Sequence, residues 1–331
     1  MQRKEIFVGV DVSKETLDAA VGGTKNHIRI ANSSQGFKQL KAWLKSLEIA
    51  LDDCWFVLEY TGGYEYRLVQ FCQAKNITFT RVPGLEIKKS LGMQRGKNDK
   101  IDARRIAEYG LEKQQKLKPH KACNAAITSL KQLLTQRSGF VKNKKAHEHR
   151  MKELLFMMEL KAGDAVIRHY KQAIGFAARM IKKTEAAIMK IILSDKTMSR
   201  NFELITSIPG IGNVNGWMTI AYTQNFESFA DARKYGAYCG VVPYDHTSGK
   251  SIKGKSRVSH MANKPIKADL DMAARAAATH DPEIKQYYER RIAMGKHHMA
   301  VMNEIKFKLI LRMFAVVNKG EVYVKNLKSA A

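Results

Sequence analysis

Residues 54–59 read Cys-Trp-Phe-Val-Leu-Glu, an unbroken apolar run that ends on a carboxylate. A strand that is apolar on both faces lies inside a sheet that helices cover on either side. Residues 6–11, Ile-Phe-Val-Gly-Val-Asp, have the same character and also end on an acid. Two such strands near the start of the chain predict a layered α/β domain there.

The spacing of apolar residues and the turn residues between them give the order of elements in this first domain. We expect strand, strand, strand, helix, strand, helix and strand, at residues 6–11, 17–21, 27–30, 37–47, 54–59, 66–72 and 77–82.

The chain becomes almost wholly helical after Gly110. Isoleucine recurs there every seventh residue, at Ile167, Ile174, Ile181 and Ile188. This heptad predicts a short coiled coil that would pair subunits, and an internal helical hairpin is the alternative, because Tyr170 and Thr184 suit a seam poorly.

We therefore divide the chain into three parts. Residues 1–150 form the α/β domain with trailing basic helices, residues 151–195 a helical coiled-coil segment, and residues 196–331 a mostly helical C-terminal domain.

The chain carries 57 Lys and Arg against 31 Asp and Glu, a formal net charge of +26. Such an excess is typical of proteins that bind a polyanion, above all nucleic acid. Residues 81–152 alone hold 19 cationic and 6 acidic side chains, and residues 250–267 hold six cationic and no acidic ones. No apolar run is long enough to span a bilayer and no signal peptide is recognisable, so we expect a cytoplasmic protein without a membrane partner.

The four cysteines are scattered, without Cys-x-x-Cys spacing. This distribution argues against a zinc knuckle or a disulfide framework and predicts reduced packing residues.

Four acids stand out. Asp99 and Asp102 are three residues apart in a cationic run, so a helix would place them on one face. Asp11 and Glu59 end the two apolar strands. If the four converge, their repulsion needs compensation by cations. Taken singly, each acid is as well explained by a turn or by a solvated helix face.

Oxygen ligands without nitrogen or sulfur select Mg²⁺ or Mn²⁺. Two such ions about 4 Å apart would suit in-line displacement at a phosphodiester.

Two further segments carry signals. Residues 207–212, Ser-Ile-Pro-Gly-Ile-Gly, resemble the turn of helix-hairpin-helix modules, whose backbone N–H groups hold a phosphate, although any Pro-Gly turn between helices looks similar. Residues 243–255 are polar and punctuated by glycine, which predicts a mobile loop.

Five segments together resemble the DEDD transposases of bacterial insertion sequences, along with the related site-specific DNA invertases and the bridge-RNA-guided recombinases. The resemblance runs in order from residue 5 to residue 318. Its motifs are Gly-Val-Asp-Val-Ser-Lys at 9–14, Leu-Glu-Tyr-Thr-Gly-Gly-Tyr at 58–64, Lys-Asn-Asp-Lys-Ile-Asp-Ala-Arg at 97–104, Ser-Ile-Pro-Gly-Ile-Gly at 207–212 and Pro-x-x-x-x-Ser-Gly at 243–249.

The resemblance implies a ribonuclease H-like, RuvC-like fold for the first domain and a transposase domain at the C-terminal end. It implies that Asp11, Glu59, Asp99 and Asp102 bind the metal ions. Ser248 would be the nucleophile, leaving a 5′-phosphoserine link and a free 3′-hydroxyl. Family members assemble as tetramers, so we expect a homo-oligomer between dimer and tetramer, and some are guided by an RNA that the element encodes.

The residues alone leave Ser248 open, since a serine beside glycine is also an ordinary turn residue. A hydroxyl needs activation, which the metal site would supply, or His246 two residues away.

Cations near these groups would bind nucleic-acid backbone, which gives affinity with little choice of sequence. The predicted nucleic-acid contacts are Lys97, Arg104, Arg105, Gly210, Gly212, Lys250, Lys253, Lys255 and Arg257.

The predicted function is that of a DNA recombinase that moves an insertion element, acting on the element ends and the target. A metal-dependent junction-resolving nuclease with water as nucleophile is the first alternative. A phosphotransferase of the actin and sugar-kinase class would also begin with a strand ending in Asp, but a second phosphate-binding turn is not recognisable. A nucleic-acid-binding protein without activity is the third alternative.

Overall fold

A computed structural model describes residues 5–60, 62–90, 92, 98–120, 124–248 and 252–324, and for residues 245–248 and 252–256 it describes the backbone only. The chain forms two compact units, Met1–Ala122 and Cys123–Ala331. Each unit has its own hydrophobic core and is described by itself below.

The first unit is built on a five-stranded sheet in the order β3-β2-β1-β4-β5. The two central apolar strands, β1 (Ile6–Val12) and β4 (Cys54–Glu59), are parallel neighbours. β2 (Thr16–Val21) and β3 (His27–Ala31) continue the sheet antiparallel on one side, and β5 (Thr78–Val82) is parallel to β4 on the other. The prediction of an α/β domain is thus confirmed, with the apolar strands inside.

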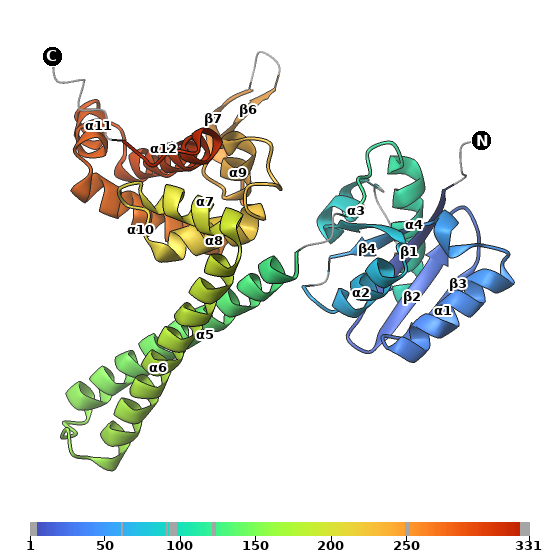
Figure 1. Ribbon diagram of the computed structural model, residues 1–331, viewed down its shortest axis with the longest axis horizontal. Coiled ribbons are helices and arrows are strands. Elements are labelled where there is room, and N and C mark those ends of the chain that lie inside the picture. Colours follow the sequence, from blue (N-terminus) through green and yellow to red (C-terminus); the bar gives the residue numbers. More distant parts are fainter. Residues whose placement is uncertain are drawn as a thin grey trace. The chain divides into compact units, whose positions relative to one another are not determined.

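Helices cover both faces of this sheet (Figure 1). Successive residues of a strand point to opposite faces. On one face Val8 and Val10 pack with residues of α1 (Ser34–Ser46) and α2 (Tyr66–Ala74). On the other face Phe7 packs with residues of α3 (Gly84–Ser90) and α4 (Asp99–Lys113), and a 3-10 turn at Leu51–Asp53 leads into β4.

α4 approaches β1 at backbone distance. A Cβ at Gly9 would lie 2.1 Å from the Ala107 nitrogen and 2.4 Å from the Ala103 oxygen, and a Cβ at Gly110 would lie 3.0 Å from the Phe7 ring. Since Gly110 lies beside Phe7, and Ala103 and Ala107 beside Gly9, α4 runs antiparallel to β1. The first turn of α4 therefore lies over the carboxyl end of β1.

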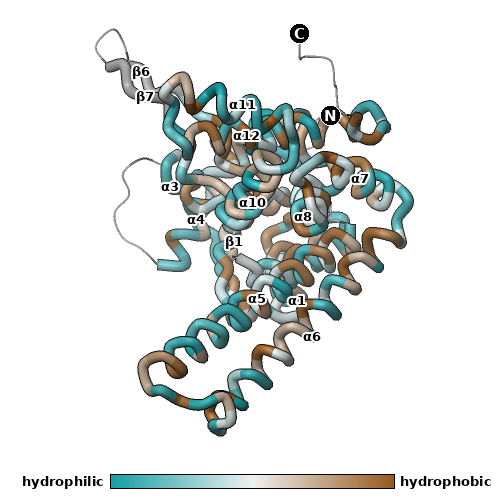
Figure 2. The backbone as a smooth tube through the Cα atoms, turned by 90° about the vertical axis from the view of Figure 1, so that its left-hand side faces the viewer, coloured by the Kyte–Doolittle hydropathy of each residue, from teal (hydrophilic) through white to brown (hydrophobic). Residues whose placement is uncertain are grey.

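The second unit begins with two long antiparallel helices, α5 (Ala125–Met157) and α6 (Ala165–Ser194), which pack against each other. The buried residues of α6 include Ile167, Thr184 and Ile188 of the predicted seam and its flank. The seam is therefore used for packing inside the chain, as the internal hairpin alternative states, and pairing of subunits through this segment stays a prediction. Figure 2 shows hydrophobic residues at the far end of this hairpin.

The hairpin also explains why the unit boundary falls near residue 122, whereas we expected a domain end at 150. α5 packs on α6 and on α8, and Ile127, Leu130 and Leu134 enter the second core. The basic helix that we assigned to the first domain is thus tied to the second unit by hydrophobic contacts.

Six further helices build the rest of this core. They are α7 (Lys196–Thr206), α8 (Asn213–Thr223), α9 (Ala232–Tyr238), α10 (Lys264–His280), α11 (Pro282–Ala293) and α12 (His298–Lys319).

The segment predicted to be a mobile loop is a two-stranded antiparallel ribbon, with strands β6 (Pro243–Ser248) and β7 (Ile252–Val258) (Figure 1). Backbone pairing from Pro243–Val258 to Ser248–Ile252 orders this segment, although its side chains do not predict strands. The prediction of a loop is therefore wrong for the described residues.

Three of the four cysteines, Cys54, Cys72 and Cys239, are free and buried, as predicted, and Cys123 lies outside the described residues. In the part of the chain that the structure describes, every helix is too short or too polar to cross a bilayer.

The contact at Gly9 gives a prediction about stability. Gly9→Ala drives a methyl group into the α4 backbone, so the free energy of unfolding should fall by at least about 2 kcal/mol. The matched control is Gly139→Ala on α5, where the space around the new Cβ is open, and which should gain about 0.5–1 kcal/mol. Urea unfolding followed by circular dichroism measures both. Equal stability of the two variants would contradict the close packing.

Candidate functional site

A row of charged residues crosses the sheet of the first unit. Asp11 of β1 pairs with Asp18 of β2, and Asp18 pairs with Arg29 of β3. Glu59 ends β4 beside Asp11, one residue beyond the last pair of β1 with β4. Residues in register on neighbouring strands share a face of the sheet. The four residues thus form one line, which we call the charged row.

The charged row faces α4. Phe7 and Gly9, which alternate with Val8 and Val10 along β1, contact that helix, and Asp11 is next in the same set. Asp99 and Asp102 lie near Asp11 at the carboxyl end of β1, because the first turn of α4 lies over this end of the strand. Asn98 caps the helix by accepting from the Ile101 N–H at 2.8 Å, so that α4 begins at Asp99.

The acids act on one another electrostatically. The pKa of Asp11 is raised from 3.8 to about 6 by partial burial and then by the charges of Glu59, Asp102 and Asp99, against a backbone hydrogen bond from Val12. Acids from two other elements, β4 and α4, therefore crowd negative charge around the Asp11 carboxyl group.

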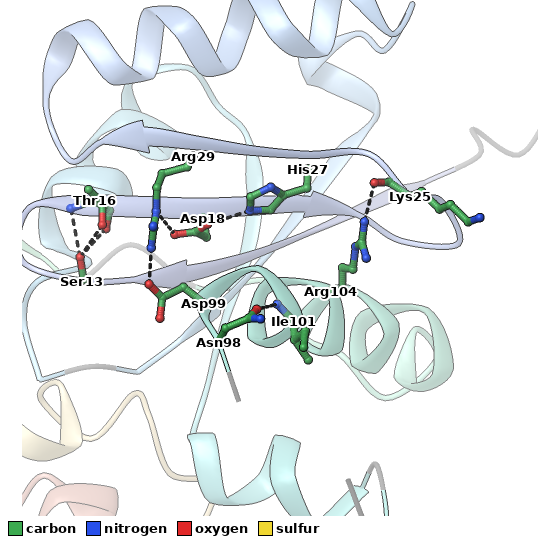
Figure 3. A network of polar contacts seen from close by, with 10 residues as sticks. All are labelled: Ser13, Thr16, Asp18, Lys25, His27, Arg29, Asn98, Asp99, Ile101 and Arg104. Carbon is green, nitrogen blue, oxygen red and sulfur yellow. Dashed lines mark hydrogen bonds and ion pairs between the residues drawn. The ribbon is translucent and has the colours of Figure 1, made fainter. Parts of the chain in front are cut away.

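Arginines neutralise part of this charge. The Arg29 guanidinium donates from Nε to Asp18 at 2.9 Å and also bonds Asp99 (Figure 3). Arg105 donates to Asp102 at 3.1 Å. Asp18 is 3% exposed and has a second partner in His27, whose Nε2 lies 2.7 Å away. The buried acid of β2 is thus compensated within the fold.

Glu59 lies against the start of α3. A Cβ at Gly84 would come within 2.1 Å of Glu59 Oε1, so any other residue there would displace the carboxylate from this position. The backbone of α3 therefore helps to fix the acid that ends β4.

The donor set is made of carboxylates, which suits a hard divalent cation. Among the described residues, no group of three or more His, Cys, Asp or Glu side chains is close enough together to hold a metal ion in the present conformation. Two of the acids instead share the positive charge of Arg29 and Arg105. The repulsion on Asp11 is the condition that a cation would relieve, so the residues fit such an ion in donor type and in charge.

Sequence reasoning missed Asp18, His27 and Arg29. The available signal was polar residues inside short, otherwise apolar strands, at Asp18 in residues 17–21 and Arg29 in residues 27–30. Strand pairing is needed to see that they lie in line with Asp11.

Ser248 is the last residue of β6 and pairs with Ile252 of β7. Residues 249–251 and the side chain of Ser248 lie outside the described part of the structure. The structure thus places Ser248 in the second unit and the four acids in the first.

The predicted nucleic-acid contacts fall into three groups. Arg104 donates to the Lys25 carbonyl at 2.8 Å and Arg105 bonds Asp102, so both are engaged within the first unit. Arg257 is exposed on β7. The other predicted lysines lie outside the described residues (Lys97 and Lys250) or are described by backbone alone (Lys253 and Lys255).

The predicted helix-hairpin-helix turn joins α7 to α8. Ile208 and Ile211 anchor it in the core. Gly210 has φ +92° and packs on α10, where a Cβ would lie 2.7 Å from the Ala273 oxygen. Gly212 is the N-cap of α8 and the space around it is open. The turn therefore leaves Gly212, more than Gly210, accessible to a ligand.

Comparisons with known proteins identify the family, and the first matched region extends beyond the first unit into α5. A family model of transposases of the DEDD and IS110 type matches residues 8–158, and a model of the transposase IS116/IS110/IS902 family matches residues 202–289. The chain is 26% identical to the pilin gene-inverting protein of Moraxella bovis, over 97% of this chain and 98% of that protein, and equally to its counterpart in Moraxella lacunata. An uncharacterized 42 kDa protein of insertion element IS900 from Mycobacterium paratuberculosis is 22% identical over 59% of this chain and 50% of that one.

The raised pKa of Asp11 gives a prediction with a sign. Its pKa is higher in the folded protein than the ordinary value, so the contribution of Asp11 to stability falls as the pH rises from about 4 to about 6. Asp11→Asn should raise the free energy of unfolding above pH 6 by on the order of 1 kcal/mol, after solvent screening, and should give no gain below pH 4.

Thermal unfolding across this pH range measures the effect of Asp11→Asn. Asp52→Asn, an exposed acid of the same unit outside the charged row, is the control and should not reproduce the gain. A loss of stability in Asp11→Asn at neutral pH would contradict the crowding of acids.

Proposed function

Because the chain belongs to the IS110/IS116 family of transposases, we propose that it recombines DNA through the four acids of its first unit and Ser248 of its second. The observation that carries this proposal is the crowding of charge on Asp11 by Glu59, Asp99 and Asp102. In a protein of net charge +26, such a cluster of acids needs a specific use.

We infer that the first unit has a ribonuclease H-like, RuvC-like fold. The strand order β3-β2-β1-β4-β5 supports this assignment. In this sheet β2 runs opposite to the other four strands. The position of the acids at the carboxyl ends of β1 and β4 supports the assignment as well.

Asp11, Glu59, Asp99 and Asp102 would hold Mg²⁺ or Mn²⁺. When bound, the ions supply charge stabilisation at the phosphodiester and lower the pKa of the attacking hydroxyl. The chain's own contribution is to fix Asp11 and Glu59 on neighbouring strands. Arg29 and Arg105 balance the charge of the helix acids Asp99 and Asp102.

Ser248 would attack the DNA. Its oxygen forms a bond to phosphorus, the bond from phosphorus to the 3′ oxygen breaks, and the serine proton balances the released 3′-hydroxyl. The resulting 5′-phosphoserine conserves the energy of the broken bond for rejoining. The Moraxella relatives support this step, since their names state that they invert a gene, and inversion requires cut strands to be rejoined.

The nucleic-acid partners are the element ends and the target DNA, and an element-encoded guide RNA fits the same positive charge. An RNA that pairs with the target would supply sequence choice that backbone contacts lack. We place the protein in the cytoplasm, where bacterial DNA lies.

We also propose a homo-oligomer of two to four copies. The far end of the α5–α6 hairpin supports it, because Phe156, Met157 and Met158 there are 86%, 76% and 63% exposed. Large apolar side chains gathered at an exposed position mark interaction surfaces.

The acids and the metal can be tested together. Asp102→Asn, or a chelator added to the wild type, should lower cleavage of element-end DNA at least about a hundredfold, because charge stabilisation of several kcal/mol is lost. Asp52→Asn is the control and should cleave normally. Full cleavage by Asp102→Asn would mean that this acid is structural and takes no part in the reaction.

The serine has its own test. Ser248→Ala should abolish the covalent protein–DNA adduct, seen as a shifted band after denaturing electrophoresis, because the attacking oxygen is gone. Thr247→Ala, which removes the hydroxyl of the preceding residue, should keep the adduct. Cleavage without an adduct in Ser248→Ala would instead identify a junction-resolving nuclease that uses water.

A further inference from the structure

The second unit contains a hollow of about 770 Å³ at the root of the β6–β7 ribbon. Pro243 and Val258 form the pair at the base of the ribbon, farthest from Ser248, and they line the hollow on one side. Residues of α12 line the hollow on the other side. Its volume lies in the range of small-molecule sites, which is about 300–1,000 Å³.

Four lysines line this hollow, and three of them have partners. Lys306 is buried and lies 2.6 Å from Asp271, and Lys296 lies 2.7 Å from Glu304. Lys308 lies over a tyrosine ring, 4.4 Å from its centroid. The positive charge at these positions is therefore built into the fold.

Lys267 differs from the other three. Its ammonium group makes no hydrogen bond or ion pair with any described residue, although its backbone N–H donates to Asn263 at 3.0 Å. Partial burial and the charge of Lys306 both lower its pKa. An unpaired, partly buried lysine costs stability, and an anion beside it would remove that cost.

The rest of the lining is largely apolar. Val241, Met299 and Phe307 supply hydrophobic surface, and Asn303 is fixed among them by donating from Nδ2 to the Val241 carbonyl at 2.6 Å. An apolar wall next to unpaired positive charge suits a ligand with a flat ring and a phosphate.

We propose that this hollow binds one nucleotide of a nucleic-acid strand, with the phosphate at Lys267 and the base against the apolar wall. The inference rests on the proposed function for the identity of the anion, and it adds a position where the strand is held beside the ribbon that carries Ser248. The strand can belong to DNA or to RNA, since both present this chemistry.

Binding of the full-length chain to short labelled single strands tests the proposal, with DNA and RNA of the same sequence measured by fluorescence anisotropy in a chelator. Without metal, the result does not depend on cleavage, so it is independent of the acids and of Ser248. Lys267→Gln should raise Kd about fivefold or more and lower the slope of log K against log salt by about one. Its unfolding temperature should stay the same or rise.

Ala300→Trp tests the hollow without changing its charge. Ala300 is an exposed lining residue on α12, so the larger ring fills the space from outside and should raise Kd by a similar factor. Lys285→Gln, an exposed lysine of α11 outside the hollow, is the matched control and should bind within about twofold of the wild type.

A loss with DNA alone, RNA alone or both supports the proposal and identifies the strand. Wild-type affinity in either Lys267→Gln or Ala300→Trp, for both strands, would overturn it. An equal loss in Lys285→Gln would also overturn it, because general charge would then explain the binding.

Discussion

The contact between the backbones of α4 and β1 at Gly9 determines the arrangement of the first unit. A side chain at this position would meet Ala103 and Ala107, so the helix can lie directly on the strand only because residue 9 is glycine. This approach brings the first turn of α4 to the carboxyl end of β1. As a consequence, the acids of α4 and β1 lie close together. The position of each acid is determined by the packing of apolar residues several positions away in the sequence.

The same arrangement creates an electrostatic conflict that the protein resolves in two ways. Asp18 is buried and has fixed partners in His27 and Arg29. The pKa of Asp11 is raised, first by partial burial and then by its acidic neighbours. The negative charge of Asp18 is therefore compensated within the fold, whereas that of Asp11 is not. Strained or unsatisfied groups of this kind concentrate at functional sites, where a ligand completes them.

Much of the first unit was predictable from sequence, because its strands are apolar and short turns separate them. The four acids could be chosen because they end strands or share a helix face. Arg29 could not be found in this way, since its role depends on pairing between β2 and β3 and on the position of α4. Register is a property of the folded sheet, and local residue patterns specify it weakly.

The second unit was harder to predict for two physical reasons. The isoleucine heptad of α6 is satisfied equally well by another chain or by α5, and periodicity does not distinguish them. In residues 243–258 the order comes from backbone pairing, while the side chains are polar and rich in glycine, as in a loop.

The two-stranded form of the ribbon has a consequence for self-association. Each outer edge of such a ribbon carries N–H and C=O groups that neither β6 nor β7 satisfies, and exposed edges of this kind tend to pair with other chains and aggregate. β7 carries Lys253, Lys255 and Arg257, so two ribbons that met edge to edge along it would bring like charges together. The cations that suit a nucleic-acid backbone thereby also oppose edge-to-edge pairing of two ribbons along β7, and high salt would weaken that repulsion.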